Sequence, residues 1–529
     1  MAPLVLLASA LLVAHSLLFN FVTDDAFISF VYSRNLVRHG QLVFNLGERV
    51  EGYTNFLWTV FLAGLMKVGL PPELSSRIFG TLAGVLGLVV ASQLHRRLRL
   101  PGLAPASAWD ALPALVLAAI PGFACWSSGG LETQLFTLLT TLGVASYLRC
   151  ELAGTPADAR RALHGAALCL GLAALTRPEG YLFFALCGLH RLIQLARARR
   201  FLPNRDEILA IGLFLLLTVP HIVFRRLYYG YFVPNTFYVK SAGGPGTWMQ
   251  GGYYLWAFAR DLKLFVLPLL WLAGLLHGRP WPEGARRQYL AAGAVTYLIS
   301  AVFLLYVASV GGDFMGLYRF VLPIVPLNVV CGCLGLWRLL SGRPPLVAGL
   351  AALGVLGLHA LNTAQVDRHA LTFIGADRGI DTPGYLRYYT ADRAAIGKWL
   401  GQHVQPDDLQ VVGGAGAQVY YAGIAAVDSF GLADAYVAHK VPAVSTRPGH
   451  QKFAPIDYVL SRKPTIITYN IYRIDDAPYQ PSFAEASVWR QRGFHFVSVK
   501  VPGLSRPYYS FLKRLDRALG PLPAVGPLD

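Results

Sequence analysis

The chain has 529 residues, of which 54% are hydrophobic and only 14% are charged, and its formal net charge is +17. A soluble protein of this length would carry about a quarter charged residues, so the composition excludes an ordinary soluble protein and predicts an integral membrane protein. The Lys and Arg residues form short clusters between apolar runs rather than one basic face, which argues against a nucleic-acid partner and is typical of membrane orientation signals.

The chain opens with the apolar run Met1–Phe21, which has no basic residues before it. A cleaved signal peptide carries a basic region there, so we expect this run to be kept as the first membrane span. Ten further runs approach the length of a span, which predicts about 11 transmembrane helices in all. They lie near 76–94, 111–126, 133–149, 163–176, 181–196, 207–223, 262–277, 288–309, 320–338 and 345–362. The shorter run Phe56–Leu70 ends in two prolines and is expected to be an interfacial helix.

Clusters of basic residues alternate with these spans, and by the positive-inside rule we place them in the cytoplasm. They lie at His95–Arg99, Arg160–Arg161, Arg197–Arg205, Arg286–Arg287 and Arg338–Arg343. The other face then receives nearly every polar, Gly-rich or aromatic loop. These loops are Thr23–Asn55, Ser127–Glu132, Thr176–Gly180, Arg225–Gly251, Gly311–Arg319 and the chain after about 363. One elaborate face is more typical of an enzyme than of a transporter, which would place charged groups near the membrane midplane.

Residues 363–529 lose the apolar runs and show the alternation of a small α/β unit. Strands are predicted at Leu409–Val412, Thr465–Thr468 and Phe494–Val499, and an amphipathic helix at Ala391–His403. We therefore predict two domains. Residues 1–362 form a transmembrane module whose first outer loop is 23–75, and residues 363–529 form a soluble α/β domain outside the cytoplasm.

Two adjacent carboxylates, Asp24 and Asp25, stand where the first span leaves the membrane, and a helix is predicted from Thr23 to about Arg38. Thr23 or Asp24 could cap that helix, but one cap needs one side chain, so the doublet leaves one carboxylate without a structural role. The functional interpretation makes one Asp a general base toward an acceptor hydroxyl, while the other orients it or holds a cation.

The remaining outer loops carry further candidates, each with a structural alternative. Tyr53 may be read as a sugar platform or as a membrane anchor, and Glu132 as a site residue or as a helix cap. Arg177 and Glu179 could pair with each other, yet Arg177 is also well placed to bind a lipid phosphate. Because a phosphate leaving group requires cations, we select Arg177, Lys240 and Arg319 as its candidate ligands.

Other catalytic signatures are missing from the sequence. It contains no His-Glu-x-x-His zinc motif, no phosphate-binding Gly-Lys-Ser/Thr loop and no Gly-x-Ser-x-Gly elbow. The glycines in Val411–Ala417 suggest a dinucleotide turn, but Val419 stands where the third glycine of that fingerprint belongs. We interpret this segment as an ordinary turn from a strand into a helix.

An Asp-Asp pair after the first span, an interfacial helix, many further spans and a C-terminal outer domain resemble the C-type glycosyltransferase (GT-C) fold. More narrowly, several motifs resemble those of the terminal arabinofuranosyltransferases of mycobacterial cell walls and their relatives. The motifs are Asp24–Ser29, Val50–Asn55, Pro234–Thr236, Gly311–Phe314, Gly431–Asp434 and Arg447–Lys452.

This resemblance implies a polyprenyl-phosphate sugar as donor, arabinofuranose by the narrower likeness, and a hydroxyl of a cell-envelope glycan as acceptor. The reaction would invert the anomeric carbon, with Asp24 or Asp25 as base, in the plasma membrane of a bacterium. The expected substrate-binding residues are Glu51, Tyr53, Asn55, Glu132, Arg177, Glu179, Asn235, Lys240, Asp313, Arg319, Asp434 and His450. The reaction needs no cofactor, although a divalent cation at the Asp pair is conceivable, and the other partner is membrane lipid.

Two alternatives remain open. A transferase of the same fold could move another hexose or pentose onto protein, pilin or lipopolysaccharide. A protein of a different class, a lipid-carrier transporter or an assembly subunit without enzymatic activity, would share the spans but would not need the one-sided carboxylates and arginines.

Overall fold

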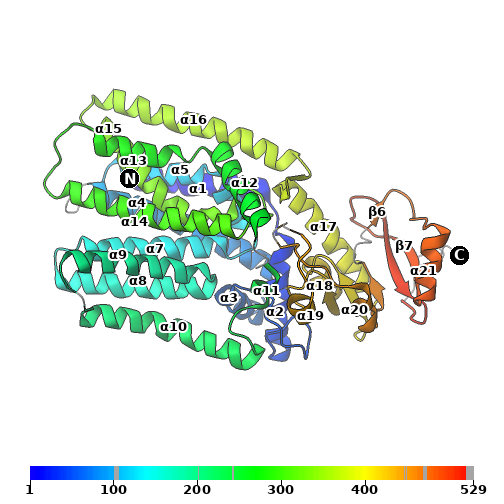
Figure 1. Ribbon diagram of the computed structural model, residues 1–529. Helices are drawn as coiled ribbons and strands as arrows, with labels where there is room; N and C mark the ends of the chain where they lie inside the picture. The colour runs from blue at the N-terminus through cyan, green and yellow to red at the C-terminus, as the bar shows by residue number, and fades with distance from the viewer. Residues whose placement is uncertain are drawn as a thin grey trace.

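A computed structural model gives the fold of residues 1–99, 106–200, 202–240, 244–445, 447, 449–468 and 473–519. Pro448 of the predicted Arg447–Lys452 motif and the last residues of the predicted C-terminal domain, 520–529, lie outside this described part. The chain forms a bundle of long helices with a smaller α/β domain at one end (Figure 1).

Six helices in the described part are long and apolar enough to cross a membrane, which makes the chain a multi-pass membrane protein. They are α1 (Ala2–Phe19), α4 (Pro72–Arg99), α10 (Arg205–Tyr229), α14 (Ala285–Ser309), the continuous pair η2 (Arg319–Ile324) and α15 (Val325–Leu340), and α16 (Pro345–Thr372). Leucines on the outer faces of these helices, such as Leu216 and Leu350, are exposed in the protein because lipid would cover them.

A bent pair of helices at the expected span 111–126 is also long and apolar enough to cross a membrane when its two parts are taken together. The first part, η1 (Ala108–Ala111) with α5 (Leu112–Ala118), meets α6 (Pro121–Ser128) at an angle of 68°. The break leaves carbonyls without helical partners, and neighbouring helices satisfy them. The Thr363 hydroxyl donates to the Ala119 carbonyl at 2.7 Å, and His15 Nδ1 lies 2.9 Å from the Ala118 carbonyl.

The four other expected spans are also helices, although they are less apolar or shorter. They are α7 (Thr133–Glu151), α8 (Pro156–Thr176), α9 (Glu179–Arg197) and α13 (Val266–Leu276). Helix α7 is buried and rich in threonine, and Thr137, Thr140 and Thr141 donate their hydroxyls to carbonyls one turn back. Such bonds satisfy polar side chains inside a bundle, which explains how a helix of moderate hydropathy can lie there.

Short helices gather at the end of the bundle nearest the α/β domain (Figure 1). They are α2 (Asp24–His39), α3 (Phe56–Lys67), α11 (Asn235–Lys240) and α12 (Pro245–Leu262). The helix predicted to start at Thr23 is confirmed as α2. The run Phe56–Leu70 contains α3, whose 12 residues are too few to span a bilayer.

The C-terminal domain follows α16, which continues to Thr372, so the predicted boundary at 362 falls inside this helix. Its helices are α17 (Pro383–Leu400), α18 (Ala417–Ala422), α19 (Ala435–Lys440), α20 (Ile456–Ser461) and α21 (Phe483–Gln491). Its strands are β1 (Ala376–Asp377), β2 (Ile380–Asp381), β3 (Leu409–Val412), β4 (Ala425–Asp428), β5 (Ile466–Ile467), β6 (Arg473–Asp475), β7 (Phe494–Lys500) and β8 (Tyr508–Arg514). The three predicted strands are confirmed, and the predicted helix is α17, which begins earlier because the Thr382 hydroxyl caps it.

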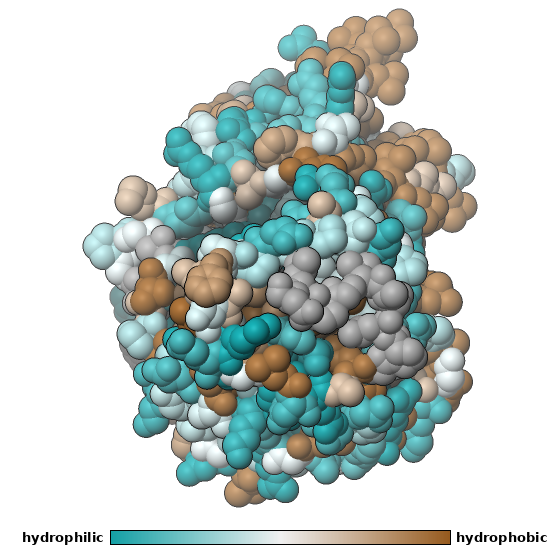
Figure 2. All heavy atoms as spheres, turned by 90° about the vertical axis from the view of Figure 1, so that its right-hand side faces the viewer, coloured by the Kyte–Doolittle hydropathy of each residue, from teal (hydrophilic) through white to brown (hydrophobic). Residues whose placement is uncertain are grey.

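The main sheet of this domain has a parallel part and an antiparallel part. Strands β4, β3 and β5 are parallel, while β8 is antiparallel to β5, β6 and β7. The carboxyl ends of the three parallel strands therefore meet at one edge, where open α/β sheets usually bind ligands. Most residues on the face that carries this domain are hydrophilic (Figure 2).

The opposite end of the bundle collects the predicted basic clusters. The connections α9–α10 and α15–α16 lie at the end far from the C-terminal domain (Figure 1). There the Arg191 guanidinium pairs with Glu151 and Glu207, both at 2.8 Å, and Arg287 donates to the Glu151 carbonyl. Two of the predicted basic clusters, 197–205 and 338–343, thus lie at the end of the molecule opposite the C-terminal domain.

Candidate active site

The two neighbouring carboxylates open α2 directly after the first span. The Thr23 amide donates to the Gly129 carbonyl at 3.0 Å, which fixes this turn against the end of α6. The structural alternative, a cap on α2 by Thr23 or Asp24, is not what the structure contains, because the Thr23 side chain makes no capping hydrogen bond and Asp24 Oδ1 accepts the Ala417 amide instead. The Thr23 hydroxyl instead lies 4.0 Å from the sulfur of Met315.

Asp24 is buried and faces the C-terminal domain. Its Oδ1 accepts a hydrogen bond from the Ala417 amide at 2.8 Å, where α18 begins. The turn before α18 comes so close that a Cβ on Gly416 would lie 2.0 Å from the Asp24 carbonyl oxygen. Burial raises the pKa of Asp24, and the Ala417 bond and the Arg393 charge oppose that rise. Asp24 therefore joins the two domains.

Asp25 lies beside it but makes no hydrogen bond or ion pair with any described residue. It lines two cavities, which we call the sheet cavity and the bundle cavity. Burial raises the pKa of Asp25 to about 6, although the Lys240 and Arg319 charges hold it down. An unpaired carboxylate with this pKa is suited to accept a proton near neutral pH.

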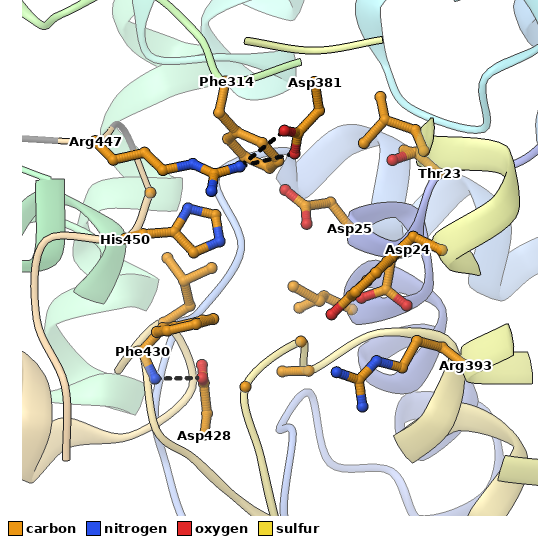
Figure 3. Close-up of a pocket in the computed structure, with 18 of the residues that line it drawn as sticks. Thr23, Asp24, Asp25, Phe314, Asp381, Arg393, Asp428, Phe430, Arg447 and His450 are labelled. Carbon is orange, nitrogen blue, oxygen red and sulfur yellow. Dashed lines mark hydrogen bonds and ion pairs between the residues drawn. The ribbon is translucent and has the colours of Figure 1, made fainter. Parts of the chain in front are cut away.

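The sheet cavity has a volume of about 270 Å³ and lies between α2 and the carboxyl ends of β3, β4 and β5. Its charged groups are held by the C-terminal domain. Asp381 accepts two hydrogen bonds from Arg447, at 2.8 and 2.9 Å, and Asp428 accepts the Phe430 and Ala433 amides at 3.0 and 2.9 Å. Figure 3 shows Asp25 facing Asp381 and His450 across this opening.

Aromatic side chains form another wall of the sheet cavity. The His450 ring meets the rings of Phe314 and Phe430 edge to face, with centroids 5.1 and 4.7 Å apart. Arg393 also lines the cavity, and its guanidinium donates to Gln418 at 2.8 Å. Polar groups beside aromatic faces are the usual surroundings of a polar ligand with apolar faces, such as a sugar.

The bundle cavity is larger, about 530 Å³, and lies among the ends of the helices. Most of its cations are paired with carboxylates. Arg177 pairs with Glu132 at 3.2 Å and with Glu179 at 3.0 Å, and Arg319 pairs with Asp313 at 2.8 Å.

Arg225, a further cation of the bundle cavity, is held in the same way by a buried residue outside it. Its guanidinium binds both carboxylate oxygens of Glu51, at 2.6 and 3.0 Å. These pairs are closed ion pairs that keep their charges inside the protein.

Lys240, at the end of α11, lines both cavities. Within the described part of the chain its ammonium has no hydrogen-bond or ion-pair partner, although Asp25 and Asp313 act on it electrostatically. Burial lowers its pKa, and the two carboxylates oppose that change. Among the described Asp, Glu, Lys and Arg side chains that line the cavities, only Asp25 and Lys240 lack a direct partner.

Eleven of the fourteen residues predicted for the site line one cavity or both. They are Asp24, Asp25, Tyr53, Asn55, Glu132, Arg177, Glu179, Lys240, Asp313, Arg319 and His450. The other three lie behind the walls. Glu51 holds Arg225, Asn235 binds carbonyls of the C-terminal domain, and the Asp434 side chain accepts the Val437 amide and the Tyr458 hydroxyl.

Sequence reasoning missed four charged residues of the sheet cavity: Asp381, Arg393, Asp428 and Arg447. A signal was present for two of them. Asp428 ends a strand next to the Gly431–Asp434 motif, and Arg447 stands in the same motif as His450. The turn at Gly413–Ala417 was correctly read as a strand-to-helix turn, but it also docks Asp24.

A divalent cation at the Asp pair finds no complete ligand set. Among the described residues, no group of three or more His, Cys, Asp or Glu side chains is arranged to hold a metal ion.

Parts of the sequence match a family of domains and known proteins. Residues 379–511 match a family described as a domain of unknown function (DUF8728). The chain is similar to the terminal beta-(1->2)-arabinofuranosyltransferase of Mycobacterium tuberculosis, with 32% identity over 56% of this chain and 49% of the relative. The Corynebacterium glutamicum protein of the same name is 30% identical over 59% of this chain and 49% of its own length. The matched region spans about half the length of these curated relatives.

Solved structures agree with the expected fold. ArnT from Cupriavidus metallidurans in the apo state superposes with a TM-score of 0.58 and 15% identity, covering 98% of both chains. The same protein bound to undecaprenyl phosphate gives 0.59 and 15% over 97% of both. The predicted GT-C fold and the predicted likeness to terminal arabinofuranosyltransferases are confirmed.

Proposed function

We propose that this chain is a membrane glycosyltransferase that moves a sugar from a polyprenyl-phosphate carrier to a hydroxyl of a cell-envelope glycan. In its finer form the proposal names arabinofuranose as the sugar and inversion as the stereochemistry. The observation that carries it is the junction of the two cavities, where the Asp25 carboxylate and the Lys240 ammonium lie in each other's electrostatic field, each without a direct partner among the residues that the structure describes.

The two charges match the two demands of sugar transfer. Asp25 takes the proton of the acceptor hydroxyl, whose oxygen then attacks the anomeric carbon on the side opposite the phosphate. The bond from that carbon to the phosphate oxygen breaks, and its electron pair leaves with the lipid phosphate. Lys240 stabilises this negative charge, with Arg319 and Arg177 behind it. A single displacement inverts the anomeric carbon and needs no covalent sugar intermediate.

The cavities divide the substrates between them. The bundle cavity combines cations with apolar walls among the helix ends, which suits the phosphate and first isoprene units of a membrane lipid. The sheet cavity is bounded by carboxylates and aromatic rings of the soluble domain, which suits the hydroxyls and ring faces of a glycan acceptor. ArnT, which shares the fold, has been solved with undecaprenyl phosphate, and this supports a polyprenyl phosphate as carrier.

A matched pair of variants tests the proposal. In membranes supplied with radiolabelled polyprenyl-phosphate arabinose, we expect Asp25→Asn to lower transfer about 10²- to 10⁴-fold, because the amide cannot take a proton. Asp24→Asn should lose far less, because its amide oxygen can still accept the Ala417 N–H. If both variants were as active as the wild type, Asp25 would not be the general base. Absence of transfer by the wild type from any lipid-linked sugar would overturn the function itself.

We also propose that the C-terminal domain lies outside the cytoplasm, because the basic connections gather at the opposite end. Single cysteines in place of Phe483, which is 91% exposed on α21, and of Ala198, at the end of α9, report on the two ends. A membrane-impermeant maleimide should label the cysteine at 483 in intact cells and the cysteine at 198 only after lysis. Labelling in the reverse order would invert the orientation.

A further inference from the structure

Helix α11 lies where the bundle, the first outer loop and the C-terminal domain meet. Its neighbours in sequence, Pro234, Thr236 and Phe237, line the bundle cavity, and Lys240 lines both cavities. Asn235 does not line either one. Its side chain points away from the cavities into the C-terminal domain and is only 6% exposed. The residue predicted to bind substrate therefore binds protein.

The amide of Asn235 holds one short segment of the C-terminal domain. Its Nδ2 donates to the carbonyls of Gly431 at 2.7 Å and Leu432 at 3.0 Å, and lies 3.3 Å from the Asp434 carbonyl. The Asn235 backbone amide donates to the Glu51 carbonyl at 2.9 Å. The start of α11 is thereby tied to both the first outer loop and the outer domain.

The segment that accepts these bonds is the wall between the cavities. Leu432 lines both cavities, and its carbonyl is so close to Gly52 that a Cβ there would lie 2.6 Å away. Gly431 has a positive φ of 86°, which side-chain-bearing residues rarely adopt, and Asp428 fixes the segment through the Phe430 and Ala433 amides. This wall is thus rigid and independently anchored.

Helix α11 is too short to hold its own direction. It has six residues, whereas isolated helices need about 12 to 15 to be even marginally stable, so its contacts set its orientation. Lys240 lies five residues after Asn235, about 7.5 Å along the helix axis. Three residues after Asn235 and on the same face of the helix, the Tyr238 ring packs on His439 of α19 with centroids 4.2 Å apart.

We propose that Asn235 is a positioning residue that acts through Lys240: it latches α11 to the Gly431–Leu432 wall and so aims the Lys240 ammonium at the donor phosphate. This inference rests on the proposed function, because it assigns the phosphate to Lys240. The same segment would then serve both substrates. Its sheet-cavity side receives the acceptor, and its carbonyls hold Asn235, which orients the helix that carries Lys240.

A double-mutant cycle tests whether Asn235 acts through Lys240. We expect Asn235→Ala to lower kcat for transfer about 10- to 30-fold with little change in the acceptor KM. In a Lys240→Met background the same substitution should cost almost nothing further, because the group that it positions has gone. Binding of a polyprenyl phosphate without sugar, measured on the purified detergent-solubilised chain, should show the same non-additivity.

Asn45 provides the matched control. It docks the same domain to the first outer loop, with its Oδ1 accepting from the Ala426 amide at 3.0 Å and its Nδ2 donating to the Ala426 carbonyl at 2.9 Å. Any loss in Asn45→Ala should multiply with that of Lys240→Met, because this contact lies away from α11. Asn235→Ser, which keeps a shorter donor, replaces the alanine variant if that one does not elute as a folded monodisperse protein.

The outcomes separate this inference from the function on which it rests. Equal fold-losses for Asn235→Ala in the two backgrounds would make the residue a general domain contact and overturn its action through Lys240. A wild-type chain that binds no polyprenyl phosphate and transfers no sugar would overturn the proposed function and the inference together. Binding that depends on Lys240 and, only in its presence, on Asn235 would support both.

Discussion

The two cavities hold their charges in different ways. In the bundle cavity, Arg177 and Arg319 are paired with carboxylates at or near the ends of the helices. In the sheet cavity, the carboxylates of Asp24 and Asp428 are held by backbone amides of the C-terminal domain. The first arrangement fixes cations among the helix ends, and the second fixes carboxylates at a sheet edge. Every described Asp, Glu, Lys or Arg side chain that lines only one of the two cavities therefore has a direct partner.

Only the junction between them remains open, because Asp25 and Lys240 face both cavities without direct partners among the described residues. A charge that is already paired can change its interaction with a ligand only by giving up its partner, which costs several kcal/mol for a buried pair. Unpaired charges can respond to a substrate directly. We therefore expect the paired groups mainly to hold the structure and the background charge of the site, and Asp25 and Lys240 to act on the substrates directly.

Removing one unpaired cation, Lys240, and one paired cation, Arg319, tests this distinction most directly. Lys240→Met should lower kcat about 10²- to 10³-fold, as expected for loss of a group that stabilises a leaving oxyanion, with little change in thermal stability. Arg319→Met leaves Asp313 buried without its partner and should destabilise the protein by about 3–5 kcal/mol. Transfer rates and melting in detergent, measured side by side, check both statements. A stable, inactive Arg319→Met with an active Lys240→Met would reverse the assignment.

The contact between Asp24 of α2 and the turn before α18 in the C-terminal domain can be strained at one glycine, Gly416. In Gly416→Ala the new Cβ would lie 2.0 Å from the Asp24 carbonyl oxygen and 2.5 Å from its Cγ, so the turn and α2 must separate. We expect transfer to fall about tenfold, because small displacements of catalytic groups are costly. Gly413→Ala is the control, since its Cβ would meet the Phe430 ring at an ordinary 3.5 Å. Similar rates for the two variants would show that this docking does not position the site.

The sequence predicts the positions of the helices and of the Asp24–Asp25 doublet better than it predicts which charged side chains are paired. Apolar runs predict the helices of the expected spans, although not α11, α12 or the last helices α19 to α21. The doublet Asp24–Asp25 stands out because one carboxylate has no local role. Pairing, by contrast, depends on residues far apart in the chain. Glu51 meets Arg225 across 174 positions, and Asp24 meets Ala417 across 393. No local pattern reports such contacts.

For the same reason Glu51, Asn235 and Asp434 were predicted as substrate-binding residues, although they lie behind the cavity walls. Each stands in a motif beside residues that do line a cavity, so the motif marks the neighbourhood but not the direction of the side chain. The C-terminal residues Asp381 and Asp428 carry no motif of their own. Asp428 reaches the site through the parallel pairing of β4 with β3, and Asp381 through the β1–β2 hairpin and its bridge to Met315. Their absence from the prediction reflects tertiary structure rather than composition.

The pH dependence of transfer gives the finest test of the junction. The base must be ionised, so kcat/KM should be constant above the pKa of Asp25, about 6, and fall roughly tenfold per pH unit below it. Burial also raises the pKa values of Asp381 and Asp428 to about 6, so the acid limb alone does not identify the group.

A Lys240 variant identifies the group that titrates, because the Lys240 charge lowers the pKa of Asp25 and is not among the causes of the shifts at Asp381 and Asp428. In Lys240→Met, measured at its reduced rate, the limb should therefore move to higher pH. If the acid limb stayed in place, the titrating group would be a carboxylate of the sheet cavity that Lys240 does not influence. The base would then not be Asp25, the carboxylate that lies in the field of Lys240.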